Sequence, residues 1–121
     1  MPLRDYKGYL FDIVEACEKV TAYSRDLTLQ DYQSDELTRL AIERILTVLG
    51  EALAQARQHY PEITQQISYA KEIVGFRNKL IHAYLHVDDG TVWGIIQMFI
   101  PVLHKEASEA LRRASQNDPD V

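Results

Sequence analysis

The sequence predicts an all-α protein, an up-and-down antiparallel bundle of four main helices plus a short one. Apolar residues recur at three- and four-residue steps along most of the 121-residue chain, which is the period of an amphipathic helix. No segment shows the alternation typical of a half-buried strand. The connections between the periodic segments are short, which favours antiparallel neighbours. We expect one helical domain over residues 1–114 and a flexible polar tail over 115–121.

The first half of the chain predicts two long helices. Tyrosine and aliphatic residues spaced three and four apart give a first amphipathic helix near residues 4–24. Residues 28–33 are polar and are interpreted as a connection. Ser34 is a suitable N-cap for a second helix, which ends near His59. Gly50 inside this helix costs roughly 1 kcal/mol against alanine, and therefore indicates close packing of another helix.

The second half predicts a short helical turn and two more helices. Residues 61–68 form the turn, and a third long helix follows over about 69–84. The Asp-Asp-Gly run at 88–90 breaks the chain and caps a fourth helix that starts near Thr91. Pro101 is expected to kink this last helix, because proline lacks the N–H of a helical hydrogen bond.

The charge of the chain argues against binding long nucleic acid over its whole surface. The formal net charge is −5, whereas proteins that grip many phosphates are usually basic. Residues 71–86 differ, because they hold the cations Lys71, Arg77 and Lys79 against the single anion Glu72. A local basic spot on an acidic body suits a small or structured RNA, or a nucleotide. The acidic remainder could face a basic partner or be an ordinary solvated surface.

Cysteine content and hydropathy favour a cytoplasmic protein. The single Cys17 cannot form an internal disulfide and lies on an apolar helical stripe, which suits a reducing compartment. No basic segment precedes an apolar one in the manner of a signal peptide. The longest apolar stretch, 92–103, contains Gln97 and Pro101 and is too short to span a bilayer. We therefore expect no membrane association.

The most informative segment is the octet 77–84, which reads Arg-Asn-Lys-Leu-Ile-His-Ala-Tyr. Arg77 offers a planar fork of donors for phosphate, and His82 can exchange protons near neutral pH. At about 100° per residue, Arg77, Asn78 and His82 border one sector of the predicted helix. Tyr84 then returns close to Arg77. Such a set suits binding or cleaving a phosphodiester.

Cleavage of RNA by its own 2′-hydroxyl requires a base, an acid and positive charge, but no metal. Each motif supplies one acid–base residue, His82, and one phosphate-binding residue, Arg77. A two-fold dimer that joins two third helices would place two of each around one cleft. We therefore expect a homodimer or a higher oligomer, with Lys71 and Lys79 supporting RNA binding.

Simpler roles are open for the same residues. The motif arginine could form a salt bridge with Glu72 or Glu43, and a lone histidine on a half-apolar helix is usually a packing residue. Glu51 could support the motif from the second helix or form an ordinary salt bridge. His82 and His86 have the spacing of metal ligands, but no third ligand is clearly placed, and no metal site is expected.

The octet and its surroundings resemble the HepT-like subfamily of HEPN-domain ribonucleases. Residues 73–84 are similar to the core of that subfamily throughout, and 49–52 resemble its second-helix pattern. The resemblance spans about residues 5–112. Ala83 follows His82 where relatives often carry glycine, a change that only slightly limits close approach.

This resemblance implies a HEPN-like bundle that acts as a metal-independent endoribonuclease without a cofactor. It further implies the toxin of a type VII-like toxin–antitoxin system, working as a homodimer. Arg77 and His82 are then catalytic and Asn78 gives polar support. Tyr84 is the residue that a minimal nucleotidyltransferase antitoxin modifies by AMPylation, which sets an anion against Arg77 in competition with RNA. The alternative is a non-catalytic HEPN module that binds a nucleotide or docks a nucleotidyltransferase.

Overall fold

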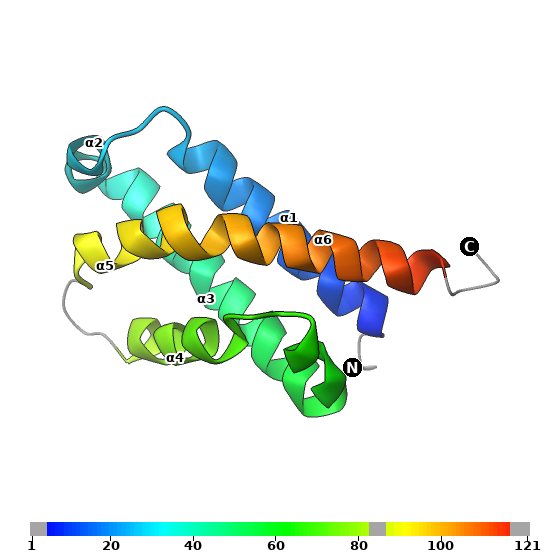
Figure 1. Ribbon diagram of the computed structural model, residues 1–121. Helices are drawn as coiled ribbons and strands as arrows, with labels where there is room; N and C mark the ends of the chain where they lie inside the picture. Colours follow the sequence, from blue (N-terminus) through cyan, green and yellow to red (C-terminus); the bar gives the residue numbers. More distant parts are fainter. Residues whose placement is uncertain (1–4, 83–86, 117–121) are drawn as a thin grey trace.

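The computed structural model describes residues 5–82 and 87–116, and every regular element within these stretches is helical (Figure 1). The elements are α1 (Tyr6–Ser24), α2 (Leu29–Ser34), α3 (Glu36–His59), the 3-10 turn η1 (Pro61–Gln65), α4 (Ala70–Ile81), α5 (Asp89–Gly94), the π turn η2 (Ile95–Phe99) and α6 (Ile100–Gln116). The prediction of an all-α fold is confirmed.

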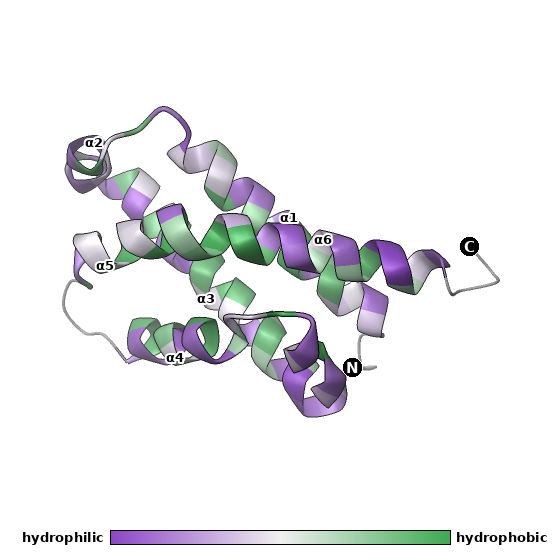
Figure 2. Cartoon of the chain, viewed as in Figure 1, coloured by the Kyte–Doolittle hydropathy of each residue, from purple (hydrophilic) through white to green (hydrophobic). Residues whose placement is uncertain are grey.

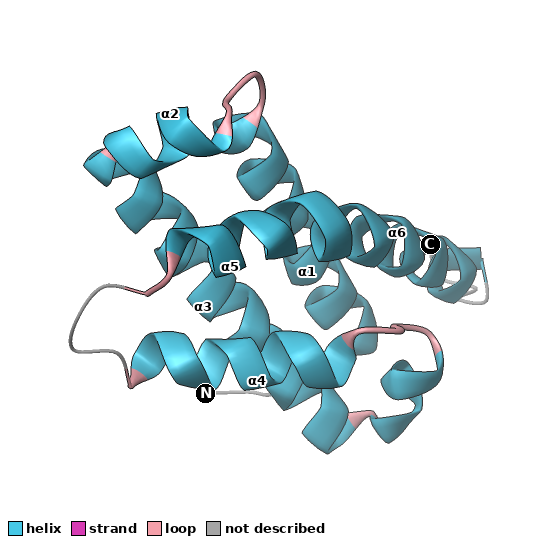
Figure 3. Cartoon of the chain, turned by 60° about the vertical axis from the view of Figure 1, so that its left-hand side comes forward, coloured by secondary structure: helices cyan, strands magenta, loops and turns pink. Residues whose placement is uncertain are grey.

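The long helices alternate in direction, as expected for an up-and-down bundle (Figure 1). Helix α1 packs against both α3 and α6, and α4 packs against α3 (Figure 3). The helix that carries the motif octet is therefore held mainly by one neighbour. Its remaining surface is available for contacts outside the bundle.

One apolar core joins the helices. Hydrophobic and hydrophilic segments are interleaved along the long helices (Figure 2), as expected when each contributes one apolar stripe. Fully or almost fully buried members include Leu10, Ile13, Cys17 and Val20 of α1, Ile42, Leu46, Leu49 and Leu53 of α3, Ile73 of α4, and Ile100, Leu103, Ala107 and Ala110 of α6. Burial raises the pKa of the Cys17 thiol to about 12, because the thiolate would lie in an apolar environment.

Helix α2 occupies most of the segment predicted as a polar connection, so that prediction is wrong. The Thr28 hydroxyl accepts the Asp31 N–H, and the Asp31 carboxylate accepts the Thr28 N–H, which closes a capping box. Tyr32 is fully buried and anchors this short helix to the core. Ser34 is the last residue of α2, and Asp35 rather than Ser34 is the N-cap of α3, where it accepts the Thr38 N–H.

Helix α4 ends at Ile81, so the predicted end at Tyr84 is wrong. His82 is its C-cap, with φ −93° and ψ 6°. Tyr84 lies outside the described residues. The predicted cap at 88–90 is confirmed, because Asp88 accepts the Thr91 N–H at the start of α5.

The disturbance expected at Pro101 takes the form of a π turn just before it. The Ile100 N–H donates to the Ile95 carbonyl, five residues back, instead of four. This wider turn accommodates a proline that cannot donate a hydrogen bond of its own. Helix α6 then continues to Gln116.

Candidate active site

Helix α4 presents the motif because its apolar residues fix the rotation of the helix. Ile73 and Phe76 are buried against the bundle, and Leu80 packs partly against the same core. Asn78 and His82 are exposed as a consequence. The polar motif is therefore divided: Asn78 and His82 face solvent, whereas Arg77 lies against α3.

Arg77 is paired with Glu51 of α3. Its Nη1 donates to the Glu51 Oε2 at 2.9 Å, and the Arg77 side chain is 19% exposed against 51% for Glu51. Of the three acidic partners that the sequence offers, the structure therefore selects Glu51 over Glu43 and Glu72. The Arg77 Nε is buried and has no hydrogen-bond partner among the described residues.

Gly50 allows α3 and α4 to approach each other at Arg77. A Cβ at residue 50 would lie 2.3 Å from the Arg77 Cβ and 2.7 Å from its Cγ, well inside contact distance. Only a glycine fits without moving the two helices apart. The expectation that Gly50 marks close packing is confirmed, and the residue it packs against is the motif arginine.

His82 lies at the C-terminal end of α4, where its side chain is exposed. Its backbone N–H donates to the Asn78 carbonyl at 3.2 Å, which ties the histidine to the last turn of the helix. Arg77 and His82 are thus five residues apart on one helical segment, the first largely enclosed and the second open to solvent.

The two lysines expected to support RNA binding, Lys71 and Lys79, are both exposed on α4. At about 100° per residue, Lys71 and Asn78 lie on the same face of the helix. Lys79 lies to one side of this face. Gly75 lies on the Lys71 face, and nothing lies within 4 Å of the position where its Cβ would be. The result is an open, polar face on α4 with no bulky side chain at its middle.

A hollow of about 420 Å³ borders the site between α1, α3 and the end of α4. Glu51 of α3 and Ile81 of α4 both line it. Ile81 is 48% exposed, so this hollow has an apolar edge that is open to solvent. Sequence reasoning did not identify this hollow, because it is formed by helices that are distant along the chain.

Within residues 5–82 and 87–116, no three side chains of the His, Cys, Asp or Glu type come together in a way that could hold a metal ion. His86, named above as a possible ligand, lies outside these residues, as does Tyr84. None of the described helices is both long and apolar enough to cross a bilayer.

Comparison with known proteins identifies the family of this chain. Residues 13–110 match the family model described as "Ribonuclease HepT-like". The chain is 34% identical over 110 residues to a protein of Thermococcus cleftensis named "Probable ribonuclease HepT", covering 91% of this chain and 98% of the relative. It is also 32% identical over 122 residues to a protein of Methanocaldococcus jannaschii named "Putative RNase MJ1216", covering 98% and 97%. No solved structure matches significantly.

Proposed function

Because the chain belongs to the HepT-like ribonuclease family, we propose that it is the endoribonuclease toxin of a toxin–antitoxin system. It cleaves RNA without a metal at a site shared by two subunits. The observation that carries this proposal is the arrangement on α4, where Arg77 is held by α3 and His82 remains exposed at the end of the same helix.

The chemistry requires three contributions, and the motif residues can supply them. A base removes the proton from the 2′-hydroxyl, whose oxygen attacks the adjacent phosphorus, and an acid protonates the leaving 5′-oxygen. His82 suits either proton transfer. Arg77 suits stabilisation of the extra negative charge on the phosphate in the transition state. The products are a 2′,3′-cyclic phosphate and a free 5′-hydroxyl.

A dimer supplies the second acid–base group. The Lys71, Gly75 and Asn78 face of α4 has room for a partner helix, since no side chain projects from Gly75. The exposed Ile81, on the side of the helix next to Asn78, adds apolar area. Two copies joined in this way would bring two His82 side chains to one cleft. Light scattering at micromolar concentration should therefore give at least twice the 13.9 kDa of one chain; a monomer would contradict the shared site.

Cleavage is tested with the purified chain, a single-stranded RNA and EDTA. We expect cleavage to persist in EDTA and to leave 2′,3′-cyclic phosphate ends, measured by mass spectrometry. His82→Ala should abolish it. His104→Ala is the matched control, because His104 is a half-exposed histidine on α6 whose polar contact is with Glu18 of α1. RNA binding without cleavage by the parent chain would instead favour a non-catalytic binding module.

Regulation is proposed to act through Tyr84, two positions after His82. A minimal nucleotidyltransferase antitoxin would transfer AMP from ATP to the tyrosine hydroxyl and release pyrophosphate. The new phosphodiester anion would compete with RNA phosphate for Arg77. Co-expression with a nucleotidyltransferase encoded next to this chain should relieve growth arrest and add AMP mass, and Tyr84→Phe should prevent both. Neutralisation of Tyr84→Phe without a mass change would mean that the antitoxin acts by binding.

A further inference from the structure

The Arg77 side chain is held by two contacts and has one further buried nitrogen. Glu51 accepts a hydrogen bond from Nη1, the stem of the side chain lies against Gly50, and Nε is buried. No described residue bonds Nη2. Nη1 is therefore held by the Glu51 carboxylate, while Nη2 can donate to a ligand.

Glu51 has two opposite effects on a phosphate at this position. Its hydrogen bond fixes the orientation of a side chain that otherwise has many rotamers. Its negative charge also repels the phosphate and offsets part of the Arg77 charge. At 51% exposure the carboxylate is hydrated, so the pair adds little to stability by itself. A role in stability alone does not explain why one partner is enclosed and the other open.

We propose that Glu51 is a positioning residue, which holds Arg77 in the orientation needed for cleavage at the expense of RNA affinity. This inference rests on the proposed ribonuclease function. Glu51 touches Arg77 and not the reacting atoms, so it acts through the arginine. Affinity and turnover should then respond to its removal in opposite directions.

Two substitutions separate orientation from charge. Glu51→Gln keeps a side-chain oxygen that accepts the Arg77 hydrogen bond but removes the charge. Glu51→Ala removes both. Glu72→Gln is the matched control, because it neutralises an exposed carboxylate on α4 that forms no ion pair with Arg77 in the structure. Thermal unfolding of each variant verifies that the fold is retained.

Binding is measured by fluorescence anisotropy with a labelled 2′-O-methyl RNA, which cannot be cleaved, and turnover with the unmodified RNA. Both Glu51 variants should bind about three- to tenfold more tightly than the parent chain. The kcat of Glu51→Ala should fall by about 10- to 100-fold, because a displaced arginine no longer matches the transition state. The kcat of Glu51→Gln should stay within about threefold of the parent. Glu72→Gln should show neither change.

The affinity measurement does not depend on cleavage. Glu51→Gln should tighten binding in the parent chain and leave it unchanged in an Arg77→Ala background, since the effect passes through the arginine. Equal tightening in both backgrounds overturns the inference whether or not the chain cuts RNA. A Glu51→Ala variant whose affinity and kcat fall together overturns it as well. If the parent binds RNA but does not cleave it, the proposed function fails while the affinity cycle still decides the role of Glu51. Absence of RNA binding by the parent overturns both.

Discussion

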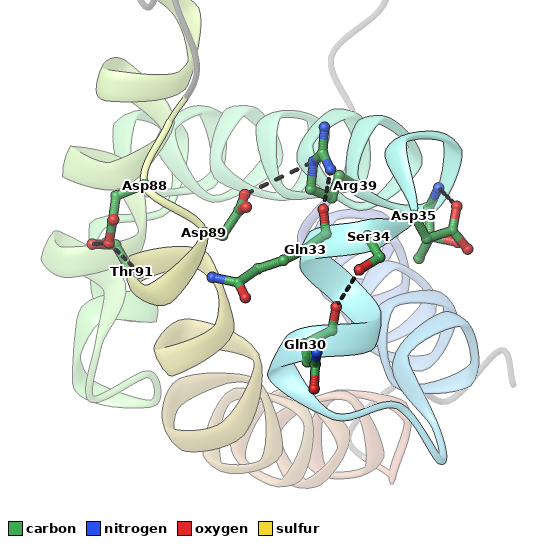
Figure 4. A network of polar contacts seen from close by, with 9 residues as sticks. Gln30, Gln33, Ser34, Asp35, Arg39, Asp88, Asp89 and Thr91 are labelled. Carbon is green, nitrogen blue, oxygen red and sulfur yellow. Dashed lines mark hydrogen bonds and ion pairs between the residues drawn. The ribbon is translucent and has the colours of Figure 1, made fainter.

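Two arginines of this protein, Arg39 and Arg77, are alike in burial but differ in what surrounds them. Each side chain is 19% exposed, each Nε is buried without a hydrogen-bond partner among the described residues, and each pairs with a carboxylate on another helix. Arg39 also donates from Nη1 to the Gln33 carbonyl of α2 (Figure 4). Its carboxylate, Asp89 of α5, is only 13% exposed, with 3.9 Å between the Arg39 Nε and the Asp89 Oδ1.

The difference predicts different roles for the two arginines. Arg39 belongs to α3. It contacts a backbone carbonyl of α2 and an enclosed carboxylate of α5 (Figure 4). It therefore holds three elements together. Arg77 spans two helices and its partner Glu51 is half exposed, so water and ligands reach the pair. An enclosed arginine whose partner is also enclosed is a structural feature, whereas one with an open partner is suited to binding an anion.

The largest expected effects are a loss of activity in Arg77→Ala and a loss of stability in Arg39→Ala. Arg77→Ala should lower kcat by at least about 100-fold, because the transition state loses the positive charge that stabilises its phosphate. Its unfolding free energy should change by less than about 1 kcal/mol. Arg39→Ala should lower the unfolding free energy by about 2–3 kcal/mol, because it removes a largely enclosed side chain that joins α2, α3 and α5, yet retain kcat per folded molecule.

Urea denaturation and RNA cleavage measure both quantities. Arg112→Ala is the control, because Arg112 is an exposed arginine on α6. If Arg39→Ala loses activity while remaining as stable as the parent, the distinction between the two arginines is wrong.

The next effect concerns the close contact that positions Arg77. Gly50→Ala would place its methyl group 2.3 Å from the Arg77 Cβ, so α3 and α4 must separate. We expect a net loss of about 1–2 kcal/mol in unfolding free energy and reduced cleavage. Gly94→Ala is the matched control, since nothing lies within 4 Å of its Cβ position, and it should gain about 0.5–1 kcal/mol from helix propensity. A Gly50→Ala variant more stable than the parent would show that the helices can move apart without cost.

The structural features that depend on local sequence pattern could be predicted from the sequence. Helical periodicity gave the four antiparallel long helices, and a glycine inside an apolar helix indicated the close contact at Gly50. The octet predicted that Arg77 and His82 lie on one short helical segment, as α4 and its C-cap show; their catalytic roles stay predictions. These signals are carried by residues near one another in the chain, so they can be recognised without the fold.

The rest depended on how the helices are packed. Which of Glu43, Glu51 and Glu72 pairs with Arg77 is set by the rotation of α3 against α4, and that rotation follows from packing. Helix α2 has six residues, too few to show a period, and its capping box lies in a polar run. No glycine or proline marks the end of α4 at Ile81, so the helix was expected to continue.

The smallest expected effect is on the unfolding free energy of Tyr32→Phe, which tests whether the surroundings of Arg39 are closed to water. This tyrosine is fully buried, stands 5.6 Å from Trp93 between ring centroids, and its hydroxyl has no hydrogen-bond partner among the described residues. Tyr32→Phe should therefore change the unfolding free energy at pH 7 by no more than about 1 kcal/mol. A larger loss would mean that the hydroxyl is hydrogen-bonded in solution and that the region is less enclosed than the structure indicates.

The same variant should differ from the parent at alkaline pH. Burial, followed by the charges of Glu43 and Asp89, raises the pKa of Tyr32 well above its ordinary value of 10.0. Above pH 10 the unfolded chain loses this proton while the folded chain keeps it, so stability falls as the pH rises. Tyr32→Phe removes that contribution, and its denaturation midpoint should decline less steeply than that of the parent above pH 10. Tyr23→Phe, at a half-exposed tyrosine of α1, is the control. Cys17 lowers the stability at alkaline pH equally in all three proteins. If the denaturation midpoints of the parent and of Tyr32→Phe decline in parallel, Tyr32 is not enclosed among the charges that surround Arg39.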